Sequence, residues 1–331
     1  MRGFVAAIVR EAALRLPKGF TPSTIYFGGG TPSMLSPKHL GDLVAGLQEH
    51  IDTTQIKEWS FEANPATFTP AKAEHWCALG INRVSLGAQS FEPRLLRLLG
   101  REHSPDQIVE SVQLLRRVGI PQVNLDLMFC LPGQSPDEWR HSLEATLALE
   151  PDHVSTYSLT LEEGTPYAAA YPQPDEDTEI ALYTISHELL TSGGYEHYEI
   201  SNYARGKTAR SAHNLAYWRG EDYYGLGPGA CGTLGNRRYV NSPDTAAYIH
   251  ALVARHLPPG EEERLTGEQR LMEQIGLRLR MDEGLPISLI PEARLEIARQ
   301  LCAEGLATLT DRLILTPRGM LLADEIATAL L

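Results

Sequence analysis

The 331-residue sequence predicts an α/β fold: a partial (β/α)6 barrel, similar to a TIM barrel, followed by a smaller and mostly helical module. Short apolar runs that end at Gly, Asn or Pro alternate with helical patterns, which is typical of βα units in a parallel sheet. Polar motifs follow nearly every predicted strand rather than a single point of the sheet, which favours a barrel over a doubly wound sheet. Beyond residue 265 the pattern is helical with one short hairpin.

The predicted strands are rich in β-branched and aromatic residues, and they lie at 24–27, 58–62, 83–86, 123–128, 153–159 and 195–200. Helical patterns occupy 4–16, 38–50, 70–79, 105–118, 136–149 and 176–192. Four of these helices begin with a capping Ser or Thr followed by Pro at the first helical position, at residues 36–37, 69–70, 104–105 and 135–136. Because the chain opens on a helix, we expect the barrel to lack its first strand.

The sequence divides into three predicted parts. Residues 1–204 form the partial barrel, and residues 205–258 form a connector rich in Gly, Asn, Tyr and Arg. Residues 258–263 read as a linker, because Pro, Gly and a run of Glu follow one another. Residues 259–331 form a winged-helix-like module with short strands at 306–309 and 312–315. This module has few basic residues, so we expect it to pack against the barrel rather than bind DNA.

Composition excludes several classes of protein. Lys and Arg total 29 and Asp and Glu total 42, which gives a formal charge of −13 and argues against a nucleic-acid-binding surface. No apolar run reaches the roughly 18 residues of a membrane span, so we expect no integral membrane protein. The apolar stretch before Arg10 is too short for a signal peptide, and we therefore expect a cytoplasmic protein.

Three consecutive glycines, Gly28, Gly29 and Gly30, follow the first predicted strand, and Thr31 comes next. Without Cβ atoms, their backbone N–H and C=O groups can touch a ligand closely. A plain strand-to-helix turn needs only one glycine, so the run favours a ligand, although a turn remains the alternative. The spacing is neither that of a phosphate-binding P-loop nor G-x-G-x-x-G.

Polar side chains stand at the ends of the next two predicted strands and within the one after them. Glu62, Gln89 and Asp126 should meet at the carboxyl-end rim of the sheet, where barrel enzymes place their sites. Together they would form an acceptor-rich floor suited to ribose hydroxyls and an ammonium group. Arg101 can bind a carboxylate through two hydrogen bonds. Each of these residues taken alone can also be a satisfied polar group of the core.

Seven strings occur in register along the chain: YFGGGTPS, FEANP, RVSLGAQSF, NLDLMFCLPGQS, HVSTYSLT, HNLAYW and YYGLGPGACG. With them the chain resembles, over nearly its whole length, the radical S-adenosylmethionine (radical SAM) proteins related to oxygen-independent coproporphyrinogen III oxidase. The resemblance implies a radical SAM barrel. It also implies that Gly28, Gly29, Gly30, Thr31, Glu62, Gln89, Arg101 and Asp126 bind S-adenosylmethionine.

Within that superfamily, His213-Asn214-Leu215-Ala216-Tyr217-Trp218 matches the H-N-x-x-Y-W signature of the haem chaperone branch, HemW. The resemblance implies that His213, Asn214, Tyr217 and Trp218 bind haem, with His213 as the candidate iron ligand. It implies transfer of haem to an acceptor, such as a membrane-associated respiratory protein. The alternative for this segment is that Tyr217 and Trp218 are core anchors and His213 is a hydrogen-bonded loop residue.

The superfamily holds a [4Fe–4S] cluster with the motif C-x-x-x-C-x-x-C, and these 331 residues do not contain that motif. The four cysteines, Cys77, Cys130, Cys231 and Cys302, are widely spaced, so we expect no cluster in this chain. Either the native protein carries the motif upstream, or it is a haem binder without a cluster. The alternative functions are a coproporphyrinogen oxidase-like radical enzyme of porphyrin biosynthesis, whose cluster motif would lie upstream, and a scaffold that binds neither ligand.

Two cysteines stand at positions where relatives usually have another residue. Cys130 stands where the family usually has Gly, before Leu131-Pro132-Gly133, and its side chain would intrude on the floor of the adenosine pocket. Cys231 stands where many relatives have His, so its thiolate is a second candidate haem ligand. A small residue in a glycine-rich turn is the other interpretation of Cys231. Arg205, Arg210 and Arg219 are close in sequence to His213 and are expected to pair with haem propionates.

Overall fold

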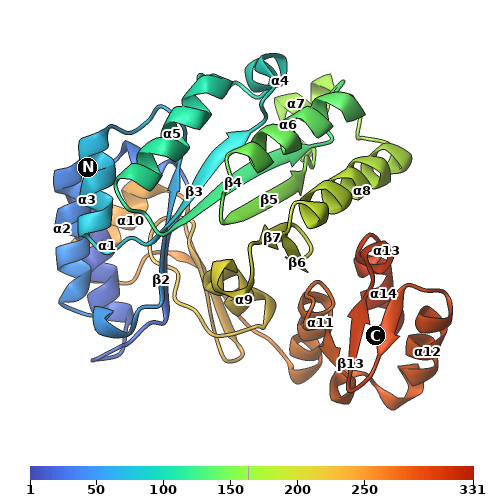
Figure 1. Ribbon diagram of the computed structural model, residues 1–331. Coiled ribbons are helices and arrows are strands. Elements are labelled where there is room, and N and C mark those ends of the chain that lie inside the picture. The colour runs from blue at the N-terminus through green and yellow to red at the C-terminus, as the bar shows by residue number, and fades with distance from the viewer. Residues whose placement is uncertain (163) are drawn as a thin grey trace.

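A curved sheet forms the centre of the molecule, and its first strands run parallel (Figure 1). The computed structural model describes residues 1–162 and 164–331. Each strand from β1 to β5 pairs in parallel with the next one along the chain. These strands are β1 (Thr24–Phe27), β2 (Glu58–Ala63), β3 (Arg83–Gln89), β4 (Gln122–Phe129) and β5 (His153–Ser158). The predicted α/β class with a partial parallel barrel is therefore confirmed.

Helices cover the outer face of this sheet (Figure 1). The predicted caps form: the side chains of Ser36, Thr69, Ser104 and Ser135 each accept a backbone N–H of the helix that follows, and Pro opens each helix. The helices of this region are α2 (Pro37–Gln48), α3 (Pro70–Ala78), α4 (Pro93–Leu98), α5 (Pro105–Arg117), α6 (Pro136–Ala148), α7 (Pro166–Ala170) and α8 (Glu176–Ser192).

The sixth predicted strand pairs differently from the expected parallel barrel. The run at 195–200 forms β6 (Glu196–Glu199), but β7 (Asn202–Ala204) lies between β6 and β5. Strand β7 is antiparallel to both neighbours. The sequence prediction missed β7 because three residues are too few to show an alternating pattern. The described sheet is thus a parallel half-barrel with the antiparallel hairpin of β6 and β7 at one edge.

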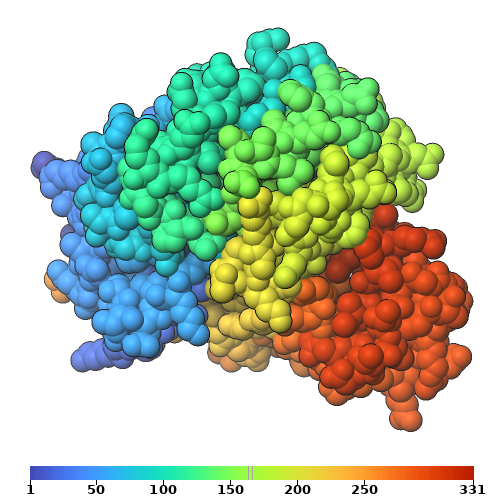
Figure 2. Space-filling model, in the orientation of Figure 1, coloured from blue at the N-terminus to red at the C-terminus, as the bar shows by residue number. Residues whose placement is uncertain are grey.

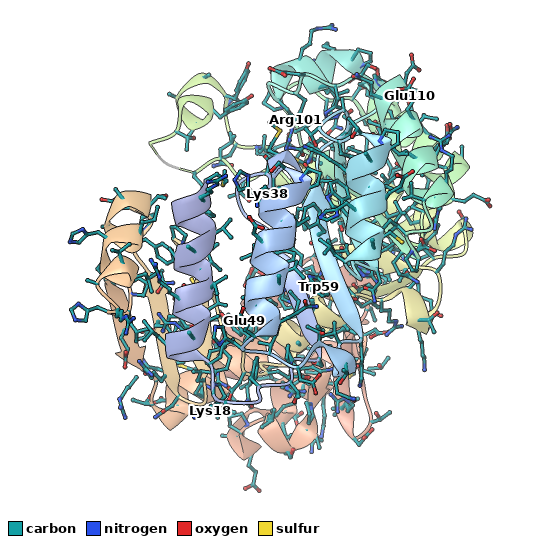
Figure 3. The ribbon with its side chains drawn as sticks, turned by 90° about the vertical axis from the view of Figure 1, so that its left-hand side faces the viewer. Lys18, Lys38, Glu49, Trp59, Arg101 and Glu110 are labelled. Carbon is teal, nitrogen blue, oxygen red and sulfur yellow. The ribbon has the colours of Figure 1, made fainter. Side chains whose placement is uncertain are left out.

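The opening helix α1 (Arg2–Arg15) packs between α2 and α10 (Thr245–Val253), and these helices stand side by side in Figure 3. Glu11 of α1 is fully buried and ion-paired with Arg15 at 3.0 Å. It also accepts hydrogen bonds from Tyr248 of α10, the Asn241 side chain and the backbone N–H of Gly227. A buried charge with this many donors ties the first helix to the segment after residue 220.

The predicted connector contains ordered elements. Helix α9 (Ala212–Trp218) carries the H-N-x-x-Y-W signature, and it is followed by the antiparallel strands β8 (Cys231–Leu234), β9 (Arg237–Asn241) and β10 (Gly260–Arg264). The prediction of a linker at 258–263 is wrong in part, because residues 260–264 form β10. That strand lies fully exposed at a sheet edge, so its charged side chains gave no apolar signal.

The C-terminal residues form a separate lobe, orange to red in Figure 2. Its elements follow the helix–strand–helix–strand–strand order of a winged helix: α11 (Gly267–Arg278), β11 (Leu285–Pro286), α12 (Leu295–Ala303), β12 (Ala307–Leu309) and β13 (Arg312–Leu315), then α13 (Pro317–Met320) and α14 (Ala323–Leu330). The exact division of the chain at residues 204 and 258 remains a prediction. No helix among the described residues is long and apolar enough to cross a membrane.

Candidate functional site

A cavity of about 580 Å³ opens at the carboxyl ends of the parallel strands. Its walls include eight of the predicted site residues: Gly29, Gly30, Thr31, Glu62, Gln89, Arg101, Asp126 and Asn214. Figure 3 shows Arg101 at the end of the molecule where α2 begins near Lys38, opposite the end that carries Lys18 and Glu49. Strands and helices run in opposite directions in βα units, so this is the end where the strands finish. The structure therefore brings most of the predicted rim together.

The glycine run forms one wall of the cavity. Gly29 has a φ of +96°, and no atom lies within 4 Å of where a Cβ would stand on Gly29 or Gly30, so both face open space. Gly28 does not line the cavity; a Cβ there would collide with the Tyr26 ring and lie 2.8 Å from Glu62. Gly28 thus permits close packing against Tyr26, and the next two glycines leave their backbone uncovered at the cavity wall.

Glu62 is held in place by two donors from the first strand and its loop. The Tyr26 hydroxyl donates to Glu62 Oε1, and the backbone N–H of Gly29 donates to Oε2 at 3.1 Å. Burial and the nearby Glu62 carboxylate both raise the pKa of Tyr26, so the phenol stays protonated and remains a donor. The sequence analysis did not single out Tyr26, although it opens the string YFGGGTPS.

Asp126 lies on the cavity floor in a network of neutral donors. Its carboxylate accepts hydrogen bonds from Ser85 Oγ at 2.8 Å and Asn124 Nδ2 at 2.7 Å. Burial raises the pKa of Asp126 to about 6, partly offset by these donors. Asn124 in turn accepts from His153 Nδ1 at 2.7 Å, and burial holds the pKa of His153 well below its usual range. The floor is therefore polar and preorganised, and the pKa of Asp126, at about 6, lies close to neutral pH.

Gln89 and Arg101 complete the far side of the cavity. Gln89 has a φ of +65°, an uncommon conformation for a side chain other than Gly, and such strain is concentrated at functional sites. Arg101 donates to Asn64 Oδ1 at 3.1 Å, and Asn64 also lies 3.5 Å from Thr31. Gly87 leaves room for these groups, because a Cβ there would stand 2.8 Å from Asn64 Oδ1. Asn64 thus links two predicted ligand residues that are distant in sequence.

Helix α9 forms another wall of the cavity through Ser211 and Asn214. His213 itself lies on the β1 side of the helix, with its ring stacked on Tyr26 at a centroid distance of 4.6 Å and an interplanar angle of 7°. Its Nδ1 lies 3.3 Å from Thr24 Oγ1. Burial lowers the pKa of His213 to about 4, so the imidazole is neutral at pH 7. Its Nε2 has no hydrogen-bond partner among the described residues and is not a buried atom.

Tyr217 and Trp218, the two aromatic residues of the signature, point in different directions. Tyr217 is 39% exposed, contacts the His213 ring edge-on at 4.8 Å and packs against Tyr223 at 4.4 Å. Trp218 turns the other way and packs with the apolar cluster that contains Tyr198, Leu215 and Met281. The core-anchor interpretation fits Trp218, whereas Tyr217 lies with His213 on an open aromatic surface. Tyr217 is four residues from His213 and lies on the same face of the helix, whereas the next residue, Trp218, is turned about 100° further around the axis.

The three arginines expected to meet haem propionates are engaged elsewhere. Arg210 pairs with Asp282 at 2.7 Å and with Glu196 at 2.9 Å. Arg219 pairs with Glu283, and Arg205 lies 3.6 Å from Glu150. The pairs with Asp282 and Glu283 fasten the two ends of α9 to the turn between α11 and β11 of the C-terminal lobe. A role of the three arginines toward haem propionates remains a prediction.

The four cysteines lie in separate places. Cys77 ends helix α3, Cys130 is buried in the main core, Cys231 is exposed on β8, and Cys302 lies on α12. Among the described residues no group of three His, Cys, Asp or Glu side chains is placed to hold a metal ion. The cysteines present therefore do not fit a [4Fe–4S] cluster.

Cys130 occupies a strained backbone position, with a φ of +59°. This conformation costs a residue with a Cβ about 1–2 kcal/mol, which explains why Gly suits the position. We expect Cys130→Gly to be more stable than Cys130→Ala by about 1 kcal/mol in urea unfolding. At Cys302, inside a helix, the order should reverse, because Gly costs about 1 kcal/mol relative to Ala there. The same order at both positions would contradict the assignment of strain.

Comparisons with known proteins agree with this geometry. The sequence profile of the radical SAM superfamily matches residues 5–146. The heme chaperone HemW of Mycobacterium tuberculosis is 37% identical over 94% of this chain and 81% of its own length. That of Bacillus subtilis is 32% identical over 99% of this chain and 91% of its own length. Coproporphyrinogen III oxidase (HemN) of Escherichia coli, at 22% identity, shares the fold with a TM-score of 0.83 over 99% of this chain and 82% of that chain.

Proposed function

Because this chain belongs to the HemW family of the radical SAM superfamily, we propose that it is a haem chaperone that binds haem at His213 and passes it to an acceptor protein. The observation that carries the proposal is the state of the His213 ring. A neutral imidazole with Nδ1 beside Thr24, and with an Nε2 that is not fully buried and has no partner among the described residues, is the arrangement in which a histidine can ligate iron. Tyr217 and Tyr223 beside it offer apolar faces to a porphyrin.

The second part of the proposal is that the cavity binds S-adenosylmethionine. Backbone groups of Gly29 and Gly30 would approach the ligand closely, and Glu62 and Asp126 would accept hydrogen bonds from its hydroxyl and ammonium groups. Arg101 would bind its carboxylate. Arg83 supports a bound ligand in this cavity, because it lines the wall and its Nη1 is a buried donor without a partner among the described residues.

A porphyrinogen oxidase is the competing function. When bound, a [4Fe–4S] cluster would supply the electron for radical chemistry, but the cysteines of this chain do not converge on one place. The likeness to coproporphyrinogen III oxidase concerns the fold alone. The described residues therefore favour binding and transfer over radical chemistry. The acceptor in this proposal is a haem protein, such as a membrane-associated respiratory protein.

Haem transfer tests the chaperone function directly. The haem-loaded chain is mixed with a molar excess of an apo haem protein of the respiratory chain, and the holoprotein spectrum is followed over time. A chaperone should transfer haem at a rate that rises with acceptor concentration, because a complex forms before release. A rate independent of the acceptor would mean spontaneous dissociation and would count against the proposal.

Binding of S-adenosylmethionine should weaken at acid pH. The pKa of Asp126 is raised to about 6, so its carboxylate becomes protonated as the pH falls through 6 and loses acceptor strength. Calorimetry should show affinity falling about tenfold between pH 7 and pH 5, in proportion to the ionised fraction. Asp126→Asn should bind weakly and show little pH dependence over the same range. A wild-type profile that matches the variant would place the ligand away from Asp126.

A further inference from the structure

The Glu58 carboxylate lies buried beneath helix α9, at the start of β2. It is 6% exposed and accepts five hydrogen bonds. Two come from the sheet, from Arg83 Nε at 3.0 Å and Ser60 Oγ at 3.1 Å. Three come from the start of α9: Ser211 Oγ at 3.1 Å, and the backbone N–H groups of Ala212 at 2.8 Å and His213 at 3.0 Å.

These contacts satisfy helix donors that would otherwise be unpaired. The N-cap residue Ser211 accepts from the backbone N–H of Asn214, which leaves the N–H groups of Ala212 and His213 free of any partner in the helix. A carboxylate from a different strand takes both. A negative charge is also favourable at this end of a helix. Glu58 therefore fixes where α9 begins and how the helix is rotated about its axis.

The register of the sheet places Glu58 and Thr24 opposite one another. In the parallel pair β1–β2, Thr24 is matched with Glu58 and Tyr26 with Ser60. Glu58 holds the backbone of His213, Thr24 lies 3.3 Å from its Nδ1, and Tyr26 stacks on its ring. Residues of the β1–β2 pair thus hold the backbone, one ring nitrogen and one ring face of His213. With Nδ1 and one ring face engaged, Nε2 is the nitrogen left open.

From this geometry we propose that Glu58 is a positioning residue for His213: through the first turn of α9 it holds the imidazole against Thr24 and Tyr26 with Nε2 presented outward. The inference rests on the proposed function in one respect: that function makes the Nε2 of His213 the ligand of haem iron. Arg83 completes the arrangement, because it neutralises Glu58 and also donates to the backbone carbonyls of Ala209 and Arg210 just before the helix.

The test uses Glu58→Gln, which keeps the size of the side chain but replaces one acceptor oxygen with a donor that cannot receive the helix N–H groups. Glu11→Gln is the matched control, since Glu11 is also buried, is paired with an arginine at 3.0 Å and accepts a backbone N–H, but on helix α1. The readout is the ¹⁵N chemical shifts of the His213 ring in haem-free protein, which report the tautomer and environment of each nitrogen.

We expect Glu58→Gln to move the His213 ring signals toward those of a free imidazole and to raise the haem dissociation constant about tenfold. Glu11→Gln should leave both unchanged even if it lowers the melting temperature. Wild-type ring signals in Glu58→Gln, or equal changes in both variants, would overturn the inference. If Glu58→Gln does not fold, Glu58→Asp gives the same comparison, because it keeps the charge near Arg83 but withdraws it from the helix. If wild-type haem is not ligated by His213, the proposed function fails while the ring signals still decide the role of Glu58.

Discussion

Replacing His213 with alanine should remove the imidazole-ligated spectrum of bound haem and weaken binding by at least about tenfold, the loss of one good ligand contact. The expectation follows from the ring itself, which is neutral at pH 7 and presents Nε2 without a competing partner among the described residues. The aromatic surface of Tyr217 and Tyr223 would remain, so residual haem association is expected through apolar contact. The Soret band and the titration endpoint are the measurements.

His250→Ala is the control, because His250 is exposed on α10, outside the signature helix. It should titrate like the wild type. If His213→Ala also titrates like the wild type, the haem site is elsewhere. Cys231 would then be the next residue to replace, because its thiol is exposed on β8.

We also expect this 331-residue chain to carry out no radical chemistry. A [4Fe–4S] cluster needs three thiolates within a few Å of one another, and the four cysteines lie in α3, the main core, β8 and α12. Anaerobic reconstitution with iron and sulfide should give no stoichiometric cluster, and incubation with S-adenosylmethionine and reductant should give no 5′-deoxyadenosine. About four irons and four sulfides per chain, together with that product, would contradict the prediction.

Burial supports the same prediction for Cys130. Burial raises the pKa of its thiol to about 11, so the thiolate needed to bind iron is scarce at neutral pH. A Cys130→Ala variant should therefore match the wild type in iron content after reconstitution.

Local chemistry made most of the barrel predictable. Capping residues followed by Pro located four helices, and short runs rich in β-branched and aromatic residues located the parallel strands. In β2 and β4 apolar residues alternate with polar ones, because one face of the sheet packs against helices and the other lines the cavity. The same reasoning missed β7 and β10. One is too short to show a pattern, and the other is an exposed edge strand whose charges carry no information about burial.

The parts of the site that lie on neighbouring strands were predictable from the sequence. The parts that depend on contacts between distant segments of the chain were not. Glu62 and Gln89 lie at the carboxyl ends of β2 and β3, and Asp126 lies within the neighbouring β4, so the parallel order of the strands brings them together. Tyr26 and Glu58 contact α9 because this helix, which is distant in sequence, packs against β1 and β2. No local sequence pattern predicts such a contact. The ion pairs of Arg210 and Arg219 were not predictable for the same reason, since their acidic partners lie in other elements.

A haem titration of the wild-type chain, followed in the Soret region, shows whether His213 ligates haem. We expect saturation near one haem per chain with the spectrum of imidazole ligation, because a neutral histidine held against Tyr26 lies beside one aromatic surface. Absorbance that rises without saturation, or a spectrum without an imidazole ligand, would mean that haem adheres to apolar surface and that His213 is not a haem ligand.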